Sequence, residues 1–229
     1  MLKAVLWDMD GTLVDSEPLW GEVTYAMSEA MGRRLGSAQR AATVGGSVEN
    51  TIRICAEHAG LDPATIDVSQ WRSYMLDNVA TLMEQRLALF PGVRELLTDI
   101  TAHAIPMAIC TNTERNVAAP AFNTIGLEYF ATTICGDEVP QAKPYPDMYC
   151  LAAQQLGVQP ADCLVFEDSE AGMTAAVAAG CVVIGVPEDT HAPIPAGVHL
   201  LRDVAEEPSY QGLDYEQLAA WHAQFRQSL

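Results

Sequence analysis

Two pairs of carboxylates each follow a short apolar run, and both pairs could hold a hard cation. Asp8 and Asp10 come after the first apolar run of the chain, and Glu167 and Asp168 come after Cys163–Phe166. Short apolar runs of this kind are typical of buried strands, and the carboxyl ends of parallel strands meet at one edge of a sheet. Carboxylates gathered there repel one another unless a cation lies between them, and oxygen ligands of this kind favour Mg²⁺.

Each pair also has a simpler explanation. An Asp-x-Asp-Gly sequence such as Asp8–Gly11 is common in turns, and acidic residues before a helix cap its first turn. Either pair alone is therefore explained equally well by local structure.

Side chains that suit a phosphate group follow a third apolar run. Thr111 and Asn112 come directly after Ile105–Cys110, and a hydroxyl and an amide can donate to phosphate oxygens. Lys143 is one of only two lysines and lies in a turn before a predicted helix. Its ammonium group could offset the charge of a phosphate and of a carboxylate beside it. Turn-forming residues and a surface lysine are the ordinary explanations of these features.

The elements that must position these groups alternate along the second part of the chain. Strands are predicted at 3–9, 105–110, 132–135, 163–166 and 182–186, and helices at 93–103, 114–125, 147–156, 171–179 and 214–227. Alternation of strands and helices indicates a parallel sheet covered on both faces. Between 18 and 89 the pattern is helical instead, at 19–31, 47–58 and 68–87. The Pro-rich segment 187–197 is predicted to be a loop.

The pattern predicts an α/β protein with a Rossmann-like, doubly wound parallel sheet and an inserted α-helical cap. The sheet domain is discontinuous, at 1–16 and 90–229, and the cap domain spans 17–89. The first strand is thus separated from the others by the insert, which we expect to cover the strand ends.

Composition restricts the function classes. The chain has 229 residues, 49% of them hydrophobic, which is enough for a core without disulfides. The net charge of −18 argues against a nucleic-acid or membrane partner, and no run is apolar for long enough to span a membrane. We expect a cytoplasmic monomer with a small-molecule partner. The six scattered cysteines are predicted to be reduced core residues.

Taken together, the four groups resemble the motifs of the haloacid dehalogenase superfamily, in the branch with a helical C1 cap that includes β-phosphoglucomutases and sugar-phosphate phosphatases. The resemblance runs from Val5 to about Val186, and its motifs stand at Asp8–Glu17, Thr111–Asn112, Lys143–Asp147 and Glu167–Gly172. Four motifs in the expected order, each at a strand end or helix approach, make the resemblance specific.

The resemblance implies a role for each core residue. Asp8 would be the nucleophile that becomes an aspartyl phosphate, and Asp10 the general acid and base. Thr111 and Asn112 would hold the phosphoryl oxygens. Lys143 would bind the phosphate and offset its charge together with that of Asp8.

The resemblance also implies a Mg²⁺ cofactor. Asp8, the backbone carbonyl of Asp10, and Asp168 would hold the ion, with Glu167 bound to it directly or through water.

Differences between this sequence and other branches of the superfamily reduce the number of activities that the resemblance allows. Asp10 favours phosphoryl transfer, because dehalogenating members lack this second acid. Phosphonate-cleaving members use a lysine of the cap, and residues 18–89 contain none. Phosphosugar mutases carry a His about where this chain has Trp20. The expected enzyme is a Mg²⁺-dependent phosphatase, a phosphoric monoester hydrolase acting on a sugar phosphate. A β-phosphoglucomutase-like mutase is the alternative.

A non-enzymatic alternative is a phospho-accepting receiver module, which also combines acids, Mg²⁺, a Thr and a Lys on a parallel sheet. Such a module is near half this length and has no helical insert, so the length argues against it.

Substrate specificity is expected to come from the cap. The candidate residues lie near its start and in a Gly-containing loop, at Glu17, Trp20, Gly45, Gly46, Ser47 and Asn50. Glycines let a loop approach a ligand closely, although a helix connection with Ser47 as N-cap explains the loop equally well. Arg53 could contact a second anionic group, but a solvated helix face is its ordinary explanation.

Overall fold

A computed structural model describes residues 1–44 and 47–228. The chain divides into two compact units. The core unit contains Met1–Asp15, Ala88–Ala118 and Phe122–Leu229, and the cap unit contains Ser16–Leu87 together with Ala119–Ala121.

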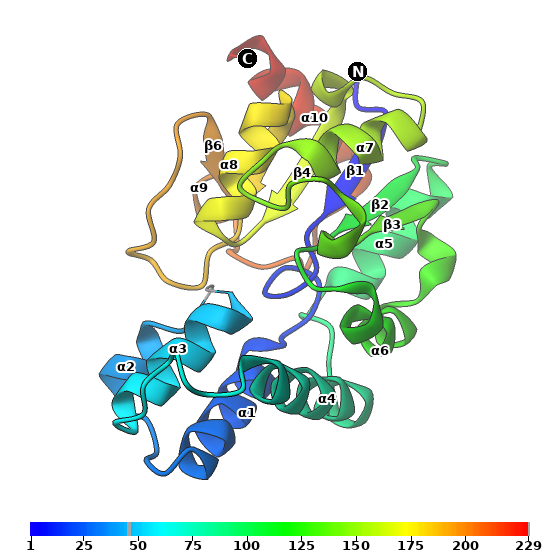
Figure 1. The fold of residues 1–229 in the computed structure, drawn as a ribbon. Helices are drawn as coiled ribbons and strands as arrows, with labels where there is room; N and C mark the ends of the chain where they lie inside the picture. Colours follow the sequence, from blue (N-terminus) through cyan, green and yellow to red (C-terminus); the bar gives the residue numbers. More distant parts are fainter. Residues whose placement is uncertain (45–46, 229) are drawn as a thin grey trace. The chain divides into compact units, whose positions relative to one another are not determined.

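The core unit is built on a six-stranded, fully parallel sheet with the order β3-β2-β1-β4-β5-β6 (Figure 1). The strands are β1 Ala4–Trp7, β2 Met107–Cys110, β3 Thr132–Ile134, β4 Cys163–Glu167, β5 Val182–Gly185 and β6 Val198–Leu200. The α-helices are α5 Val93–Ala102, α6 Arg115–Ile125, α7 Asp147–Gln155, α8 Glu170–Ala179, α9 Leu201–Val204 and α10 Tyr215–Phe225. The strand order places β1 and β4 side by side in the middle of the sheet.

Both faces of the sheet are buried, which explains why the strands are continuous apolar runs. On one face, Leu6 and Val165 pack with residues of α7 and α8. The alternating side chains Trp7 and Phe166 point to the other face. There the two rings stack with centroids 4.5 Å apart, and Tyr210 is tilted against both.

The helix that follows β4, α8, has a capping residue at each end. The side chain of Ser169 accepts a hydrogen bond from the backbone N–H of Gly172 and caps α8, and Gly180 ends the helix in the left-handed conformation.

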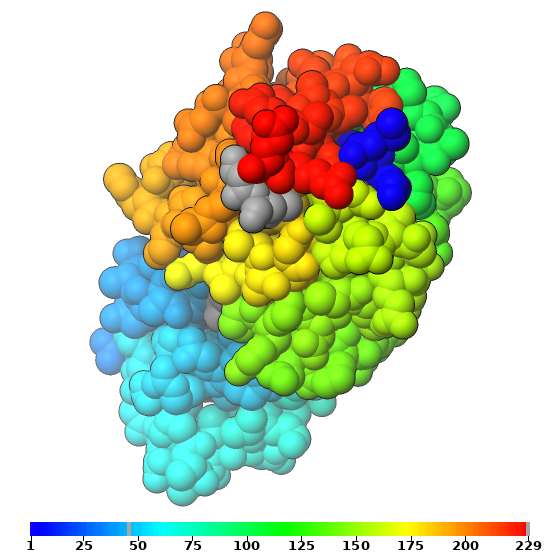
Figure 2. Space-filling view, turned by 90° about the horizontal axis from the view of Figure 1, so that it is seen from above, coloured from blue at the N-terminus to red at the C-terminus, as the bar shows by residue number. Residues whose placement is uncertain are grey.

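The two ends of the chain lie together in the core unit, where the N-terminal residues lie beside the C-terminal segment (Figure 2). Asp162 links them, because its carboxylate forms ion pairs with Lys3 at 2.7 Å and with Arg226 at 2.8 Å.

The cap unit is helical. Its helices are α1 Glu17–Ala30, α2 Ser37–Ala41, α3 Val48–His58 and α4 Val68–Arg86. Helix α1 packs against α4 and α3, and their buried faces carry apolar residues such as Met27, Ile52 and Val79.

The predicted fold class, an α/β parallel sheet with a helical insertion after the first strand, is confirmed. Among the strands and α-helices, three short elements were missing from the prediction: β6, the five-residue α2 and the four-residue α9. All six cysteines are free, and five of them are buried. Over residues 1–44 and 47–228, none of the helices has the length and apolar character needed to cross a membrane.

Candidate active site

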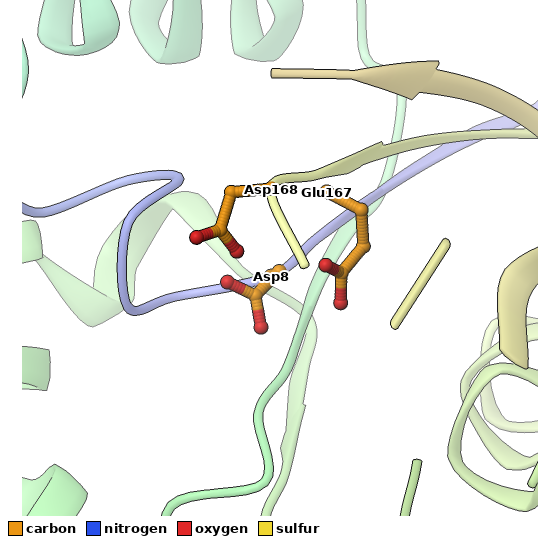
Figure 3. Close-up of side chains that lie close together, drawn as sticks. All are labelled: Asp8, Glu167 and Asp168. Atoms are coloured by element: carbon orange, nitrogen blue, oxygen red, sulfur yellow. The ribbon is translucent and has the colours of Figure 1, made fainter. Parts of the chain in front are cut away.

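The predicted carboxylates meet at the carboxyl ends of β1 and β4. Asp8 follows β1 and continues its pairing by one residue, because its backbone N–H donates to Phe166 O at 3.0 Å. Glu167 is the last residue of β4, and Asp168 follows it. One carboxylate oxygen from each of the three side chains lies within 4.8 Å of the others, and the side chains converge on one point (Figure 3).

Lys143 lies between two of these carboxylates. Its Nζ donates to Asp8 Oδ1 at 2.6 Å, to Cys110 O at 2.8 Å and to Glu167 Oε1. An ammonium group has three N–H donors, so this set uses all of them. Burial acts to lower the pKa of Lys143, but the charges of Asp8 and Glu167 outweigh it and raise the pKa above its ordinary value. The lysine is therefore a fixed positive charge at the base of the site.

Asp8 is buried, and one of its oxygens has no partner. Oδ1 accepts from Lys143, whereas the buried Oδ2 has no hydrogen-bond partner. Burial raises the pKa of Asp8 to about 7; the Lys143 charge lowers it and the Glu167 charge raises it further. An unpartnered buried carboxylate oxygen is costly, and a bound cation is one way to satisfy it.

The surroundings of Asp168 fit such a cation. Gly11 has a φ of +78°, and a Cβ built on it would overlap the Asp168 carboxylate. Burial raises the pKa of Asp168 well above its ordinary value, and the charges of Asp8 and Glu167 raise it further. The donor set consists of oxygens and carries excess negative charge, which suits Mg²⁺.

Glu167 is fully buried, and both of its oxygens are hydrogen-bonded within the protein. Oε1 accepts from Lys143 and from Tyr149 Oη at 2.9 Å, and Oε2 accepts from the backbone N–H and the Oγ of Ser169, both at 3.1 Å. A Cβ on Gly172 would overlap this carboxylate. Glu167 thus joins β4, α7 and the start of α8. Tyr149 was not predicted, because nothing in the sequence separates it from other core aromatic residues.

Asp10 is bonded to the turn that follows β2. Thr113 Oγ1 donates to Asp10 Oδ2 at 2.7 Å, and Thr111 Oγ1 lies 3.4 Å from the same oxygen. Thr111 was a predicted site residue, whereas Thr113 was not. The signal that could have found Thr113 is a second hydroxyl in the same turn, two residues later.

Asn112 contacts the backbone of the Lys143 segment. Its Oδ1 accepts from Lys143 N at 3.0 Å, and its Nδ2 donates to Lys143 O at 3.3 Å. Gly136 makes room for this turn, because a Cβ there would overlap the backbone carbonyl of Asn112. The side-chain amide therefore positions the lysine segment in this structure, and the predicted contact of Asn112 with a phosphate stays a prediction.

The predicted specificity residues belong to the cap unit. Glu17 forms an ion pair with Arg40, and Trp20 is half-buried in α1. Ser47 caps α3 by accepting from Asn50 N at 3.2 Å. Gly45 and Gly46 lie outside the described residues.

Arg53, the candidate for a second anion, is already engaged within α3. It forms an ion pair with Glu57 at 2.8 Å and donates to Asn50 Oδ1 at 2.8 Å.

The chain is similar to a known protein family and to characterised phosphatases. The family model for haloacid dehalogenase-like hydrolases matches residues 2–180. The chain is 30% identical over 180 residues to the phosphorylated carbohydrates phosphatase of Thermotoga maritima, covering 78% of this chain and 82% of that protein. It is 35% identical over 193 residues to hexitol phosphatase A of Escherichia coli, covering 82% and 85%.

A solved structure is also similar over nearly the whole length. It is CbbY from Rhodobacter sphaeroides in complex with xylulose-1,5-bisphosphate, with 26% identity, a TM-score of 0.79, and coverage of 95% of this chain and 99% of that one. The match of the family model, the identity to the two phosphatases and the parallel sheet with its helical insertion agree, and the chain belongs to the haloacid dehalogenase-like hydrolases.

Proposed function

We propose that this protein is a Mg²⁺-dependent phosphatase that hydrolyses a sugar or polyol monophosphate through an aspartyl phosphate on Asp8. The observation that carries the proposal is the environment of Asp8: Lys143 holds one of its oxygens, the other has no hydrogen-bond partner, and the carboxylate is clustered with that of Asp168. The relatives named as carbohydrate and hexitol phosphatases support the reaction class.

The reaction needs two steps. In the first, the carboxylate of Asp8 attacks phosphorus, the ester P–O bond breaks, and Asp10 gives its proton to the leaving alkoxide. In the second, Asp10 takes a proton from water, the water oxygen bonds to phosphorus, and the bond from phosphorus to Asp8 breaks. The products are the alcohol and inorganic phosphate, and both aspartates return to their starting forms.

The chain's own residues provide the charge balance for these steps. Lys143 stays next to Asp8 and offsets the negative charge that the phosphate brings. Thr111 offers its hydroxyl at the end of β2, and Asn112 keeps the lysine segment in place. We assign the cation to Asp8, Asp168 and the backbone carbonyl of Asp10. When bound, Mg²⁺ would neutralise charge on the carboxylates and the phosphoryl oxygens.

The hydrogen bonds of Glu167 favour an indirect role for this residue. Both oxygens already accept bonds from protein donors, so contact with the cation through water disturbs them least.

The charges of the cap favour a substrate with a single phosphate. Residues 17–89 contain six arginines and no lysine. Five of these arginines form ion pairs with a glutamate, in the pairs Arg34–Glu29, Arg40–Glu17, Arg53–Glu57, Arg72–Glu49 and Arg86–Glu22. At any of these five arginines a second phosphate would have to displace a glutamate, and it would approach a chain with a net charge of −18. The sixth, Arg33, is exposed and donates to His58 O. The same argument disfavours a mutase, whose catalytic cycle passes through a bisphosphate.

The test is phosphate release from a panel of hexitol phosphates, sugar monophosphates, sugar bisphosphates and phosphoglycolate, with Mg²⁺ or with EDTA. We expect Mg²⁺-dependent hydrolysis with the highest kcat/KM on a sugar or polyol monophosphate. Full activity in EDTA contradicts the cation assignment, and preference for a bisphosphate contradicts the substrate assignment.

Covalent trapping tests the assignment of the nucleophile. Asp10→Asn should accumulate labelled phosphoenzyme from a substrate with a good leaving group, and peptide mapping should find the label on Asp8. Asp8→Asn should give none. A label on any other residue contradicts the mechanism.

A further inference from the structure

We infer that Thr113 is a positioning residue for the general acid–base Asp10, acting through the hydrogen bond from its Oγ1 to Asp10 Oδ2. This inference rests on the proposed function, since it assigns a task to Thr113 only if Asp10 transfers protons.

The bond is the better formed of two hydroxyl contacts to the same oxygen. Thr113 Oγ1 lies 2.7 Å from Asp10 Oδ2, a normal length for an O–H···O bond to a carboxylate. Thr111 Oγ1 lies 3.4 Å away, which is long for such a bond. Thr111 Oγ1 also accepts the backbone N–H of Thr113 at 3.0 Å, so the two hydroxyls are held in one turn.

The turn that carries Thr113 is anchored independently of Asp10. Gly136 N donates to Thr113 O at 3.4 Å. Two residues after Thr113, the guanidinium of Arg115 donates to both carboxylate oxygens of Glu138, at 2.8 and 2.6 Å, and to the Oγ1 and the backbone oxygen of Thr133, at 2.6 and 2.8 Å. A bidentate arginine pair fixes orientation as well as distance.

Because other bonds hold the turn on this side of the contact, the Thr113 hydroxyl is placed to orient the Asp10 carboxyl group. A hydroxyl that donates to Oδ2 fixes the rotation of the Asp10 carboxyl group. Proton transfer depends on that orientation, since a general acid must lie within hydrogen-bond reach of the leaving oxygen. Thr113 therefore acts on the protonation of the leaving group through Asp10 and does not itself touch the phosphorus.

A substitution series separates this role from a general structural one. Thr113→Val removes the hydroxyl and keeps the shape, whereas Thr113→Ser keeps the hydroxyl. Thr101→Val is the matched control, because it removes a hydroxyl that donates to Leu97 O in α5, away from the site. Thermal melting of each variant reports on the fold.

The measurement is kcat for an alkyl phosphate, a poor leaving group, and for 4-nitrophenyl phosphate, a good one. We expect Thr113→Val to lower kcat for the alkyl phosphate by about tenfold or more, the size expected for one lost bond to a charged group, and to change the aryl phosphate much less. Thr113→Ser should restore the alkyl rate, and Thr101→Val should leave both unchanged. Equal losses on both substrates, or no rescue by Ser, overturn the inference.

Asp10→Asn, measured in parallel, keeps this inference distinct from the proposed function. If Asp10→Asn shows a loss that depends on the leaving group and Thr113→Val does not, only the role of Thr113 is wrong. If Asp10→Asn itself shows no such dependence, the acid–base assignment fails.

Discussion

The side-chain amide of Asn112 bonds to both the N–H and the carbonyl oxygen of Lys143, at 3.0 and 3.3 Å. The turn after β2 and the lysine segment before α7 are thereby joined across 31 residues of sequence. The position of the ammonium group beside Asp8 thus depends on the hydrogen bonds that Asn112 makes to the lysine backbone.

Removing this contact should lower activity without unfolding the protein. Asn112→Ala leaves the Lys143 backbone groups without their partners, and we expect kcat/KM to fall by about tenfold or more. Asn123→Ala, at an exposed position of α6, is the matched control and should have no effect. Steady-state kinetics and thermal melts check the prediction, and wild-type kcat/KM in Asn112→Ala would contradict it.

The two lysines of the chain should differ sharply in their contribution to stability. Lys143→Met leaves the buried carboxylates of Asp8 and Glu167 without their cation, and we expect a loss of about 3–5 kcal/mol in the free energy of unfolding without Mg²⁺. Lys3→Met breaks the pair with Asp162, in which the lysine side chain is 55% exposed, and should cost less than about 1 kcal/mol. Urea unfolding measures the free energy of unfolding of both variants. Similar losses would contradict the prediction that Lys143 contributes more to stability than Lys3.

Gly11 should be required for cation binding as well as for the turn. Gly11→Ala places a Cβ onto the Asp168 carboxylate, so we expect the Kd for Mg²⁺, measured by calorimetry, to rise by about tenfold or more. Gly157→Ala is a matched control, because Gly157 also has a positive φ, +70°, but no heavy atom lies within 4 Å of its added Cβ. Both variants should lose about 1 kcal/mol of stability, and only Gly11→Ala should lose Mg²⁺ affinity. Equal affinities in the two variants would argue against Asp168 as a ligand.

The buried His222 should make the fold less stable in mild acid. Burial lowers its pKa below the ordinary value of 6.5, and its Nε2 donates to Ala161 O at 3.0 Å. Because the unfolded chain binds the proton more readily, stability from His222 is complete above about pH 6.5 and is lost as the pH falls through the folded pKa. The pKa of Asp8 is raised to about 7, so acidification stabilises the folded state through Asp8 and opposes the effect of His222. The contribution of His222 is therefore measured as the difference between the wild type and a variant that lacks this histidine.

The test is the free energy of unfolding at pH 7.5 and pH 5.5 for the wild type and His222→Gln. Glutamine can still donate to Ala161 O but does not titrate. We expect the wild type to lose more stability than the variant on acidification, by at most about 1.4 kcal/mol, because pH 5.5 lies one unit below the ordinary histidine pKa of 6.5. His191→Gln, at an exposed position, should behave as the wild type does. Identical pH dependence in wild type and His222→Gln contradicts the prediction.

The strands that carry the site were predictable because each is an apolar run that ends in polar residues. Ala4–Trp7 and Cys163–Glu167 are buried on both faces, so the pattern is strong and the meeting of Asp8 with Asp168 follows from parallel pairing. Val198–Leu200 was missed because it has three residues, all only half-buried, and exists as a strand through its pairing with β5.

Side-chain partners within the site were less predictable. The bond from Thr113 to Asp10 and the contact of Asn112 with Lys143 depend on the shape of a turn and on rotamers, which spacing alone does not determine. The roles assigned to Asp8, Asp10 and the cap residues stay predictions until the kinetic tests are done.

The central place of β1 has a consequence for the order of assembly. Strand β1 precedes all the other strands of the sheet in the sequence, yet it is flanked by β2 and β4, and the contact between Asp8 and Lys143 spans 135 residues. Folds dominated by such distant contacts fold slowly, because the entropy cost of closing long loops comes before the free energy gained from strand pairing. During synthesis, β1 therefore has neither of its sheet partners, β2 and β4, until the helical insert has been made. During refolding from denaturant, we expect hydrolytic activity to return with the slowest phase, after most of the helical signal has recovered.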